Sequence, residues 1–457
     1  MPENNSPSPS IPRPQVLTEK ALAALQRFSH IEAVSGIALL IAAIAALAWA
    51  NSSFSASYEH FWHTRLTISF GDVSLSQSLH FLVNDGLMTI FFLVVGAEIR
   101  HEIHDGALAN IRMALLPLGA ALGGVLVPAL IYIAINHGTE ASDGWAVPTA
   151  TDIAFAVGVL ALLGKSIPGG VRVLLLALAI IDDIVAILII AVFYTSNLNL
   201  DGVAIAAGGL LMIFMFQRMG VGMMIPYVLP GAIIWYGLLK TGVHPTLAGV
   251  ILGLLSPVRS MPMTERPLDI IQRNFHELLD RFSSNDTSDH SVTKPLKEIQ
   301  QAQREILSPV QRIQATLHPW VAFGIMPLFA LANAGVSFAG ADLESSLSQN
   351  VFIAVILALV VGKPLGVILS SYVLLKLKWC ELPSDVGWAG IVLVGLLAGI
   401  GFTMSIFIAS LAFDDPALLA ASKLSVLCAS GAAAVLGLSW IWMRRLIKGK
   451  KSKVNSA

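Results

Sequence analysis

Residues 176–190, LALAIIDDIVAILII, place the adjacent aspartates Asp182 and Asp183 inside an otherwise unbroken apolar run. The run extends from about 170 to 194, which exceeds the roughly 20 residues that one helix needs to cross a bilayer. The whole chain of 457 residues is 55% hydrophobic and only 12% charged, with a mean hydropathy of +0.75. Soluble globular chains carry about 25% charged residues. This composition therefore excludes a soluble enzyme and indicates a membrane protein.

Apolar blocks of this kind recur along the chain and predict an all-α polytopic membrane protein with 12 transmembrane helices. The predicted domains are an N-terminal tail (1–33), helices 1–8 (34–258), a cytoplasmic helical insert (259–318), helices 9–12 (319–443) and a basic tail (444–457). The blocks lie at about 34–51, 81–99, 112–135, 147–163, 170–194, 202–217, 221–239, 243–257, 319–338, 351–375, 386–413 and 417–443.

The basic residues give the topology, because cytoplasmic loops accumulate Lys and Arg. With the N-terminus inside, 24 of the 28 Lys and Arg fall in cytoplasmic segments, and only Arg65 and Lys240 fall outside. One missed span would invert every later loop. We therefore expect both ends of the chain to be cytoplasmic. The near balance of basic and acidic residues gives no indication of nucleic-acid binding.

Two loops are predicted to be structured. Residues 63–79 alternate on either side of Gly71-Asp72, which is typical of a short β-hairpin on the outer face. An isolated hairpin is only marginally stable, so pairing with a second copy in a homodimer and packing on its own chain are equally good interpretations. In the insert, one helical apolar series runs from Leu268 to Phe282 and another from Ile299 to Leu317. The plain interpretation is a helical pair that packs on the transmembrane helix ends.

Four ionisable residues are expected near the bilayer centre, namely Asp152, Asp182, Asp183 and Lys363. A charge at the bilayer centre costs on the order of 2.5 to 3.5 kcal/mol on insertion scales, so it marks a functional site by default. A structural ion pair is the alternative for each of them. Three acids and one base do not cancel, which favours function. Adjacent helical positions point about 100° apart, so Asp182 and Asp183 are expected to have different roles.

Carboxylates and hydroxyls are ligands for a hard cation such as sodium or lithium, and Thr149 and Thr151 stand beside Asp152. The same oxygen atoms bind protons, so cation and protons compete for the site. Competition combined with alternating access produces exchange. If more protons leave than the single positive charge that arrives, net charge moves and the membrane potential drives transport. No cofactor is expected, because sodium, lithium and protons are substrates.

Two apolar blocks carry the residues of interrupted helices. Block four contains Pro148 and Gly158, and block eleven contains Gly395, Gly399, Gly401, Thr403 and Ser405. Each is the middle member of a triple of helices, as in transporters built from inverted repeats. If the two breaks cross, an acid balances the helix N-termini and a base balances the C-termini. Asp152 and Lys363 suit these positions. Close helix packing is the alternative explanation for the small residues.

These residues in this order resemble the NhaA-type sodium/proton antiporter family. The resemblance covers blocks one to twelve. It rests on the strings FLVNDGLMTIFFLVVGAEIRHEI, PTATDIAFAVG, LAIIDDIVAI, GVHPTLAGVILG, LHPWVAFGIMPLFALANAGVSF, GKPLG and GIGFTMSIFIASLAF.

The resemblance implies that Asp182 and Asp183 form the cation and proton site and that Lys363 pairs with Asp182 when sodium is absent. It places Asp152 where the broken helices four and eleven cross, with Thr151 near the cation. It also implies a pH-regulated antiporter of the bacterial inner membrane that forms a homodimer through the 63–79 hairpin. Residues implied for the cytoplasmic entrance and the pH response are Asp85, Glu98, Arg100, Glu102, His244 and His318.

The chain departs from the family pattern at two places. Gln314 replaces a glutamate before LHPW, after a much longer connection, and His101 replaces a basic residue of the entrance. Both changes bear on pH regulation. For His244, a packing role remains open beside a sensing role, because competition between protons and sodium itself creates a pH dependence.

Four other classes of protein are distinguishable from an antiporter. The chain has no GxxxxGK[ST] loop, which a nucleotide-driven pump would need. An intramembrane hydrolase needs two aspartates on separate helices that share one proton, whereas here two are sequential. A retinal protein with a Schiff base at Lys363 would absorb visible light. A passive channel would show current without coupled proton movement.

Overall fold

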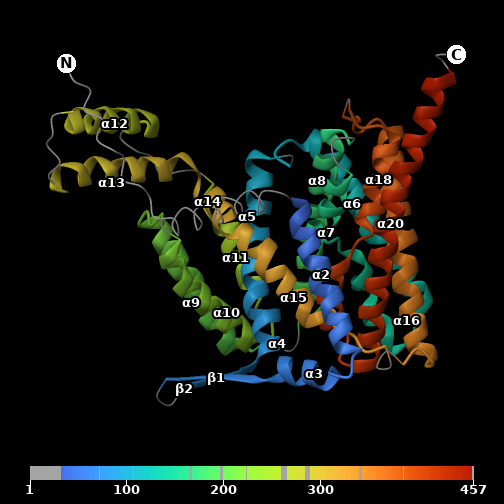
Figure 1. Cartoon of the computed structure of the whole chain (residues 1–457). Helices are drawn as coiled ribbons and strands as arrows, with labels where there is room; N and C mark the ends of the chain where they lie inside the picture. The colour runs from blue at the N-terminus through green and yellow to red at the C-terminus, as the bar shows by residue number, and fades with distance from the viewer. Residues whose placement is uncertain are drawn as a thin grey trace.

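The computed structural model describes residues 32–70, 73–106, 108–163, 167–195, 199–222, 224–258, 265–283, 289–338, 342–383 and 385–454. Most of these residues form a bundle of helices that run roughly parallel (Figure 1). The uninterrupted members of the bundle are α2 (Glu32–Ala50), α6 (Ile111–Asn136), α8 (Gly169–Phe193), α9 (Leu200–Arg218), α10 (Val228–Thr241), α11 (Leu247–Leu255) and α20 (Pro416–Val454). The predicted N-terminal tail lies almost wholly outside the described residues.

Seven helices in the described part of the chain are long and apolar enough to cross a membrane, or ten if each bent pair of helices is one span. The all-α polytopic prediction is therefore confirmed. Helices α10 and α11 occupy the seventh and eighth apolar blocks but are only 14 and 9 residues long. Each falls short of a full crossing. The count of twelve spans therefore stays a prediction.

Three spans contain a π-helical segment. These spans are α4, η1 and α5 (Leu79–Phe81, Leu82–Leu87, Met88–Asp105), α14, η5 and α15 (Pro309–Trp320, Val321–Ile325, Met326–Asn333), and α16, η6 and α17 (Ser346–Leu357, Ala358–Gly362, Lys363–Lys376). A π-helical turn changes the direction of the side chains that follow it and is frequent at functional sites. Segment η6 ends directly before Lys363, which is the first residue of α17.

The two interruptions expected from the sequence are present. The first separates η2 (Glu140–Thr149) from α7 (Ile153–Leu162) with a bend of 44°. The second separates α18 (Trp388–Ala398) from α19 (Phe402–Ala412) with a bend of 43°. Both therefore leave backbone amides and carbonyls without helical partners in the middle of a span.

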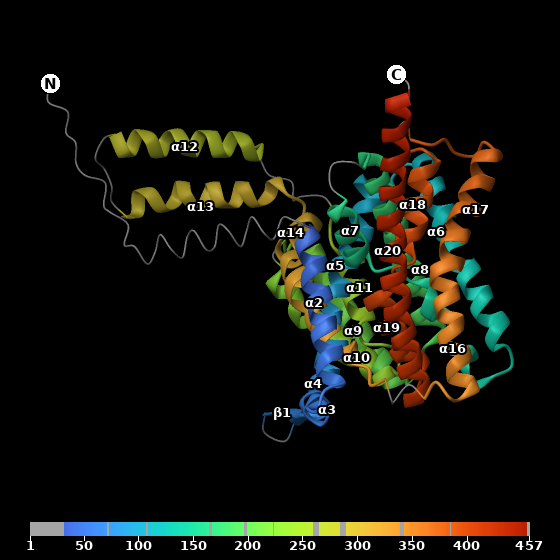
Figure 2. The ribbon, with the colours of Figure 1, turned by 45° about the vertical axis from the view of Figure 1, so that its right-hand side comes forward.

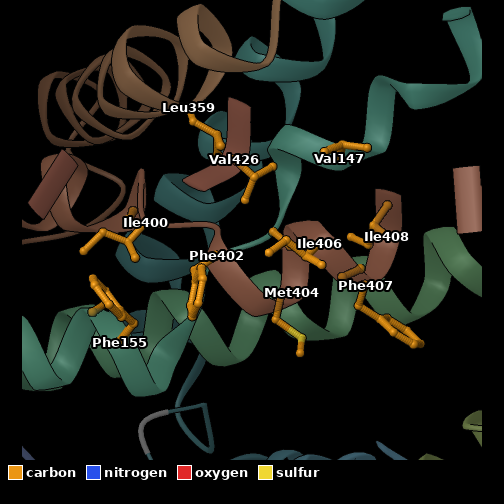
Figure 3. Close-up of a cluster of buried hydrophobic side chains, with 14 of the residues drawn as sticks. Val147, Phe155, Leu359, Ile400, Phe402, Met404, Ile406, Phe407, Ile408 and Val426 are labelled. Carbon is orange, nitrogen blue, oxygen red and sulfur yellow. The ribbon is translucent and has the colours of Figure 1, made fainter. Parts of the chain in front are cut away.

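Apolar side chains surround the two breaks. Phe155 of α7 and Phe402 of α19 face each other with their ring centroids 5.6 Å apart (Figure 3). The same cluster includes Val147, Leu359, Ile400, Met404, Ile406, Phe407, Ile408 and Val426. In such an apolar environment, free backbone groups must find partners within the protein.

The predicted hairpin is confirmed. Strands β1 (Arg65–Phe70) and β2 (Val73–Ser78) pair antiparallel, from Arg65 with Ser78 to Phe70 with Val73. The Gly71-Asp72 turn itself lies outside the described residues. The hairpin follows α3 (Ser55–His63), which bends away from α2 by 114°. Figure 1 shows both at the end of the bundle opposite to α12 (Pro267–Ser283), α13 (Asp289–Ile306) and the end of α20.

The insert differs from the predicted helical pair that packs on the transmembrane helix ends. Its second apolar series belongs to two helices, because α13 ends at Ile306 and Ser308 caps α14 in a capping box with Gln311. Helix α14 thus begins inside the range predicted for the insert. Helices α12 and α13 pack on each other and make at most isolated contacts with the described transmembrane helices. Figure 2 shows the pair standing beside the bundle, not on its helix ends.

Candidate functional site

The two interrupted helices meet at their breaks. The N–H of Asp152 donates to the carbonyl of Ile400 at 2.7 Å, which joins the unwound segment before α7 to the segment before α19. The hydroxyl of Thr151 lies 3.0 Å from the carbonyl of Ala398, the last residue of α18. Backbone groups that the breaks release are thus satisfied by the other broken helix, which holds the crossing together.

Asp152 accepts hydrogen bonds at the N-termini of both α7 and α19. Its Oδ1 accepts the N–H of Phe155 at 3.0 Å and so caps α7. Its Oδ2 accepts the N–H of Thr403 at 3.0 Å, in the first turn of α19, and also the Thr403 hydroxyl. The side chain is fully buried. A carboxylate here balances the partial positive charges of two helix ends at once.

Lys363 is buried on the other side of the crossing. Its Nζ lies 3.0 Å from Oδ2 of Asp182, and both side chains have zero exposure. The same Nζ donates to the carbonyl of Thr149, the last residue of η2, at 2.7 Å. An ammonium at this carbonyl balances the negative end of a helical segment. The expected arrangement of an acid at the N-termini and a base at a C-terminus is therefore present.

Asp182 and Asp183 sit in the middle of α8 in different surroundings. Oδ2 of Asp182 accepts the Thr151 hydroxyl at 2.6 Å and faces Lys363, while its Oδ1 has no hydrogen-bond partner in the described structure. Asp183 is 2% exposed, and neither of its carboxyl oxygens has a partner there. The acids Glu98, Asp182 and Asp152 and the base Lys363 all lie within electrostatic range of Asp183. Adjacent side chains on a helix point about 100° apart, which explains why Asp182 and Asp183 have different surroundings.

Unpartnered buried oxygen atoms are costly to leave unsatisfied, so these atoms point to a ligand or a proton. The carboxyl oxygens of Asp183 and Oδ1 of Asp182 are the strongest acceptors among them, and a hard cation prefers such oxygens. The Ser405 hydroxyl of α19 is also buried without a partner. The sequence indicated Thr403 and Ser405 only as residues of an interrupted helix. Their polarity in an apolar block was the available signal.

The residues expected at the cytoplasmic entrance do not lie together. Glu98, Arg100 and Glu102 occupy the last turns of α5, at the end away from the hairpin. Asp85 lies in η1, about 25 Å from Glu102 at the helical rise of 1.5 Å per residue. His244 Nε2 lies 3.6 Å from Asp85 Oδ1, and the two side chains are 20% and 13% exposed. Asp85 and His244 therefore form a separate pair toward the hairpin end.

Helix α14 packs on α5, and one residue of this contact, Gln311, was not singled out by the sequence. Gln311 Nε2 lies 3.3 Å from His101 Nε2, so the glutamine of the capping box meets the entrance helix. His318 is exposed near the end of α14. The two departures from the family pattern are therefore placed on neighbouring helices, and His101 takes part in their contact.

Comparison with known proteins agrees with this geometry. The family model Na+/H+ antiporter 1 matches residues 26–441. The chain is 60% identical over 440 residues to a Na(+)/H(+) antiporter NhaA of Janthinobacterium sp., covering 96% of this chain and 97% of that protein. It is 63% identical over 436 residues to Na(+)/H(+) antiporter NhaA 2 of Pseudomonas putida, covering 95% and 96%.

Among solved structures, the chain is similar to the sodium proton antiporter MjNhaP1 of Methanocaldococcus jannaschii. The TM-score is 0.45 at 14% identity, and the match covers 93% of this chain and 98% of that chain. The family match spans most of the chain, and the resemblance drawn from the sequence motifs is confirmed by the bacterial relatives. The chain is therefore a multi-pass membrane protein that belongs to the Na+/H+ antiporter 1 family.

Proposed function

We propose that this protein is a secondary transporter of the bacterial inner membrane that exports Na+ or Li+ in exchange for protons. Membership of the Na+/H+ antiporter 1 family supports sodium and protons as the substrates. The chemistry of the site extends the proposal to lithium, because carboxylate oxygens bind both small alkali cations. The distribution of basic residues supports cytoplasmic termini.

One observation carries the proposal. Asp183 is fully surrounded by protein, has two unpartnered carboxyl oxygens, and adjoins the Lys363–Asp182 pair at the crossing of two broken helices. Among the described residues, no hydrogen bond compensates this carboxyl group. It must therefore hold a proton or a cation to be tolerated at this depth. A carboxyl group that binds either a proton or a cation couples proton movement to cation movement.

The proposed exchange step involves three side chains. A cation that reaches Asp183 displaces its proton and recruits the free Oδ1 of Asp182. Asp182 then turns from Lys363 toward the cation, so the ammonium loses its counter-charge and releases a proton. Thr151 stays in place through its second acceptor, the carbonyl of Ala398. When protons return from the other side, the Lys363–Asp182 pair forms again and the cation leaves.

This sequence predicts electrogenic, pH-dependent transport. Two protons, from Asp183 and Lys363, leave for each single positive charge that binds, so one net charge crosses the membrane in each cycle. The membrane potential then contributes about 2.3 kcal/mol per charge for each 100 mV. Acid favours the protonated site and alkali favours the cation-bound site. The entrance residues Glu98, Arg100 and Glu102 add to the pH response in this proposal.

We also propose that the protein forms a homodimer through the 63–79 hairpin. In the described structure, β1 and β2 form a two-stranded sheet and pair only with each other. A two-stranded ribbon is marginally stable and leaves both edges able to pair. Pairing with the hairpin of a second copy would satisfy one edge in each chain.

The test is exchange in everted membrane vesicles that carry a pH gradient. Na+, Li+ and K+ are added in turn across a pH series, and the decrease of the gradient is measured. Asp183→Asn and Asp182→Asn should each abolish the response, because an amide does not release a proton to a cation. Asp414→Asn, the same change at an exposed aspartate, should leave it intact. Retained exchange in both site variants would refute the proposal.

A further inference from the structure

The pair α12–α13 is an independent unit beside the bundle. Asn274 of α12 is 2% exposed and donates to Glu298 of α13 at 3.1 Å. Arg273 of α12 bridges Glu265 at 2.5 Å and Glu298 at 3.6 Å. Beyond isolated contacts, neither helix packs on a described transmembrane helix. The two helices therefore hold each other and leave their other faces uncovered.

Helix α12 has more apolar surface than α13 covers. Ile270 and Leu278 are 9% and 8% exposed and face α13 along with Asn274. Leu268, Phe275 and Leu279 are 70%, 54% and 49% exposed. Their spacing of seven and four residues places them in one stripe beside the buried face. We call these three residues the α12 stripe. An apolar stripe of this kind marks an interaction surface.

The side of the bundle from which the α12–α13 pair projects indicates which surface packs against the α12 stripe. In both Figure 1 and Figure 2, the α12–α13 pair projects from the same side of the bundle as the β1–β2 hairpin, at the opposite end. Figure 1 shows α9 and α10 along the flank between the two projections. At 1.5 Å per residue, the 17 residues of α12 span about 25 Å. That length covers two or three neighbouring helices at the usual spacing of 8–10 Å.

The charge of the pair argues against the lipid surface as the occupant. Helices that lie on membranes have polar faces rich in Lys and Arg, which anionic headgroups attract. The sequence of α12 contains three acidic and two basic residues, and that of α13 contains three of each. The pair therefore has five basic and six acidic residues, and no net positive charge with which to bind an anionic leaflet.

We propose that the α12 stripe packs against the same stripe of a second copy of this chain. Two copies in one membrane share an orientation, so the two-fold axis that relates them is perpendicular to the membrane. Elements that overhang the same flank then meet their own equivalents on both faces of the membrane. An apolar stripe is self-complementary in such an isologous contact. The contact rests on the homodimer proposed above: the hairpin would join the copies at one face, and the α12–α13 pairs join them at the other as a four-helix assembly.

Cysteine cross-linking in native vesicles tests this contact. In a background with Cys380→Ser and Cys428→Ser, Phe275→Cys places a thiol on the stripe. His276→Cys is the matched control, because His276 is the next residue, is also solvent-exposed and lies about 100° away around the helix. On mild oxidation, Phe275→Cys should give covalent dimer in at least about tenfold higher yield, because only the stripe lies at the two-fold contact.

A second measurement keeps the proposal falsifiable if cross-linking is inefficient. The double variant Phe275→Glu and Leu279→Glu should raise the dimer dissociation constant in detergent by at least about tenfold, since two buried apolar contacts become charged. Its sodium/proton exchange should persist, because the stripe is remote from the site. Equal cross-linking yields with an unchanged dissociation constant would overturn the proposal. So would quenching of a fluorophore at Phe275→Cys by brominated lipids, which would identify the bilayer as the occupant.

Discussion

Replacing both members of the Lys363–Asp182 pair should disturb the fold less than replacing either one. The two groups are 3.0 Å apart with no exposed surface. Breaking a buried pair by removing one partner costs about 3–5 kcal/mol, whereas an apolar replacement of both is close to neutral. We therefore expect Lys363→Met and Asp182→Leu each to lower the free energy of unfolding by about 3–5 kcal/mol, and the double variant to lower it by less than about 2 kcal/mol.

The neighbouring hydrogen bonds set the size of this effect. In Asp182→Leu, Thr151 retains the carbonyl of Ala398 as an acceptor, and Lys363 retains the carbonyl of Thr149. The isolated ammonium is then the main source of the loss. In Lys363→Met, the isolated group is the Asp182 carboxylate, which retains only the Thr151 hydroxyl. The loss in that variant should be smaller at pH 6 than at pH 8.5, because protonation neutralises the carboxylate.

The assay is denaturant unfolding of the four purified proteins in one detergent, evaluated as a double-mutant cycle. We expect a coupling energy of about 3 kcal/mol or more between the two positions. Exchange in vesicles should be lost in the two variants that lack Asp182 and altered in Lys363→Met, so stability rather than activity reports the pair. If the two single effects add within about 0.5 kcal/mol, the ion pair does not hold the crossing together.

Three further results follow from the site. Lys363→Ala should change the pH dependence and the voltage response of exchange, and wild-type behaviour in vesicles at controlled potential would contradict its part in proton release. Asp152→Ala should reduce the exchange rate without abolishing it, because Asp152 caps α7 and binds α19 but is not the cation's main ligand here; complete loss in folded protein would argue otherwise. The apparent KM for sodium should rise as pH falls, by up to about tenfold per unit for one competing proton, and a pH-independent KM would exclude competition.

Local sequence patterns predicted the elements that lie close together along the chain. The hairpin follows from alternation around a two-residue turn, and the interrupted helices follow from Gly, Pro and Thr inside apolar blocks. Both depend on short-range backbone preferences, so a single sequence suffices. The four buried charges were also evident, because the cost of a charge in a bilayer does not depend on its partner.

Contacts between distant residues were less predictable. Residues assigned together to the entrance separate into Asp85 with His244 near the hairpin end and Glu98 to Glu102 at the opposite end. The contact between Gln311 and His101 depends on where α14 begins, which the capping box at Ser308 determines. The helical pair of the insert was expected on the helix ends, but α12 and α13 pack mainly on each other.

The sequence alone determined which groups this protein must compensate: three acids and one base near the bilayer centre, and the free backbone groups of two interrupted helices. The bilayer imposes a free-energy cost on each buried charge and each free backbone group, and this cost does not depend on what the other residues do. Only the tertiary structure decided which group pairs with each charge and which group binds each free backbone atom. It pairs Lys363 with Asp182 and binds Asp152 to both α7 and α19, and among the described residues it gives the Asp183 carboxyl no hydrogen-bond partner. Asp182 and Asp183 are adjacent in α8, and their side chains differ in the direction in which they leave the helix. Which groups each side chain meets depends on the helices packed around α8, and the sequence does not give that packing.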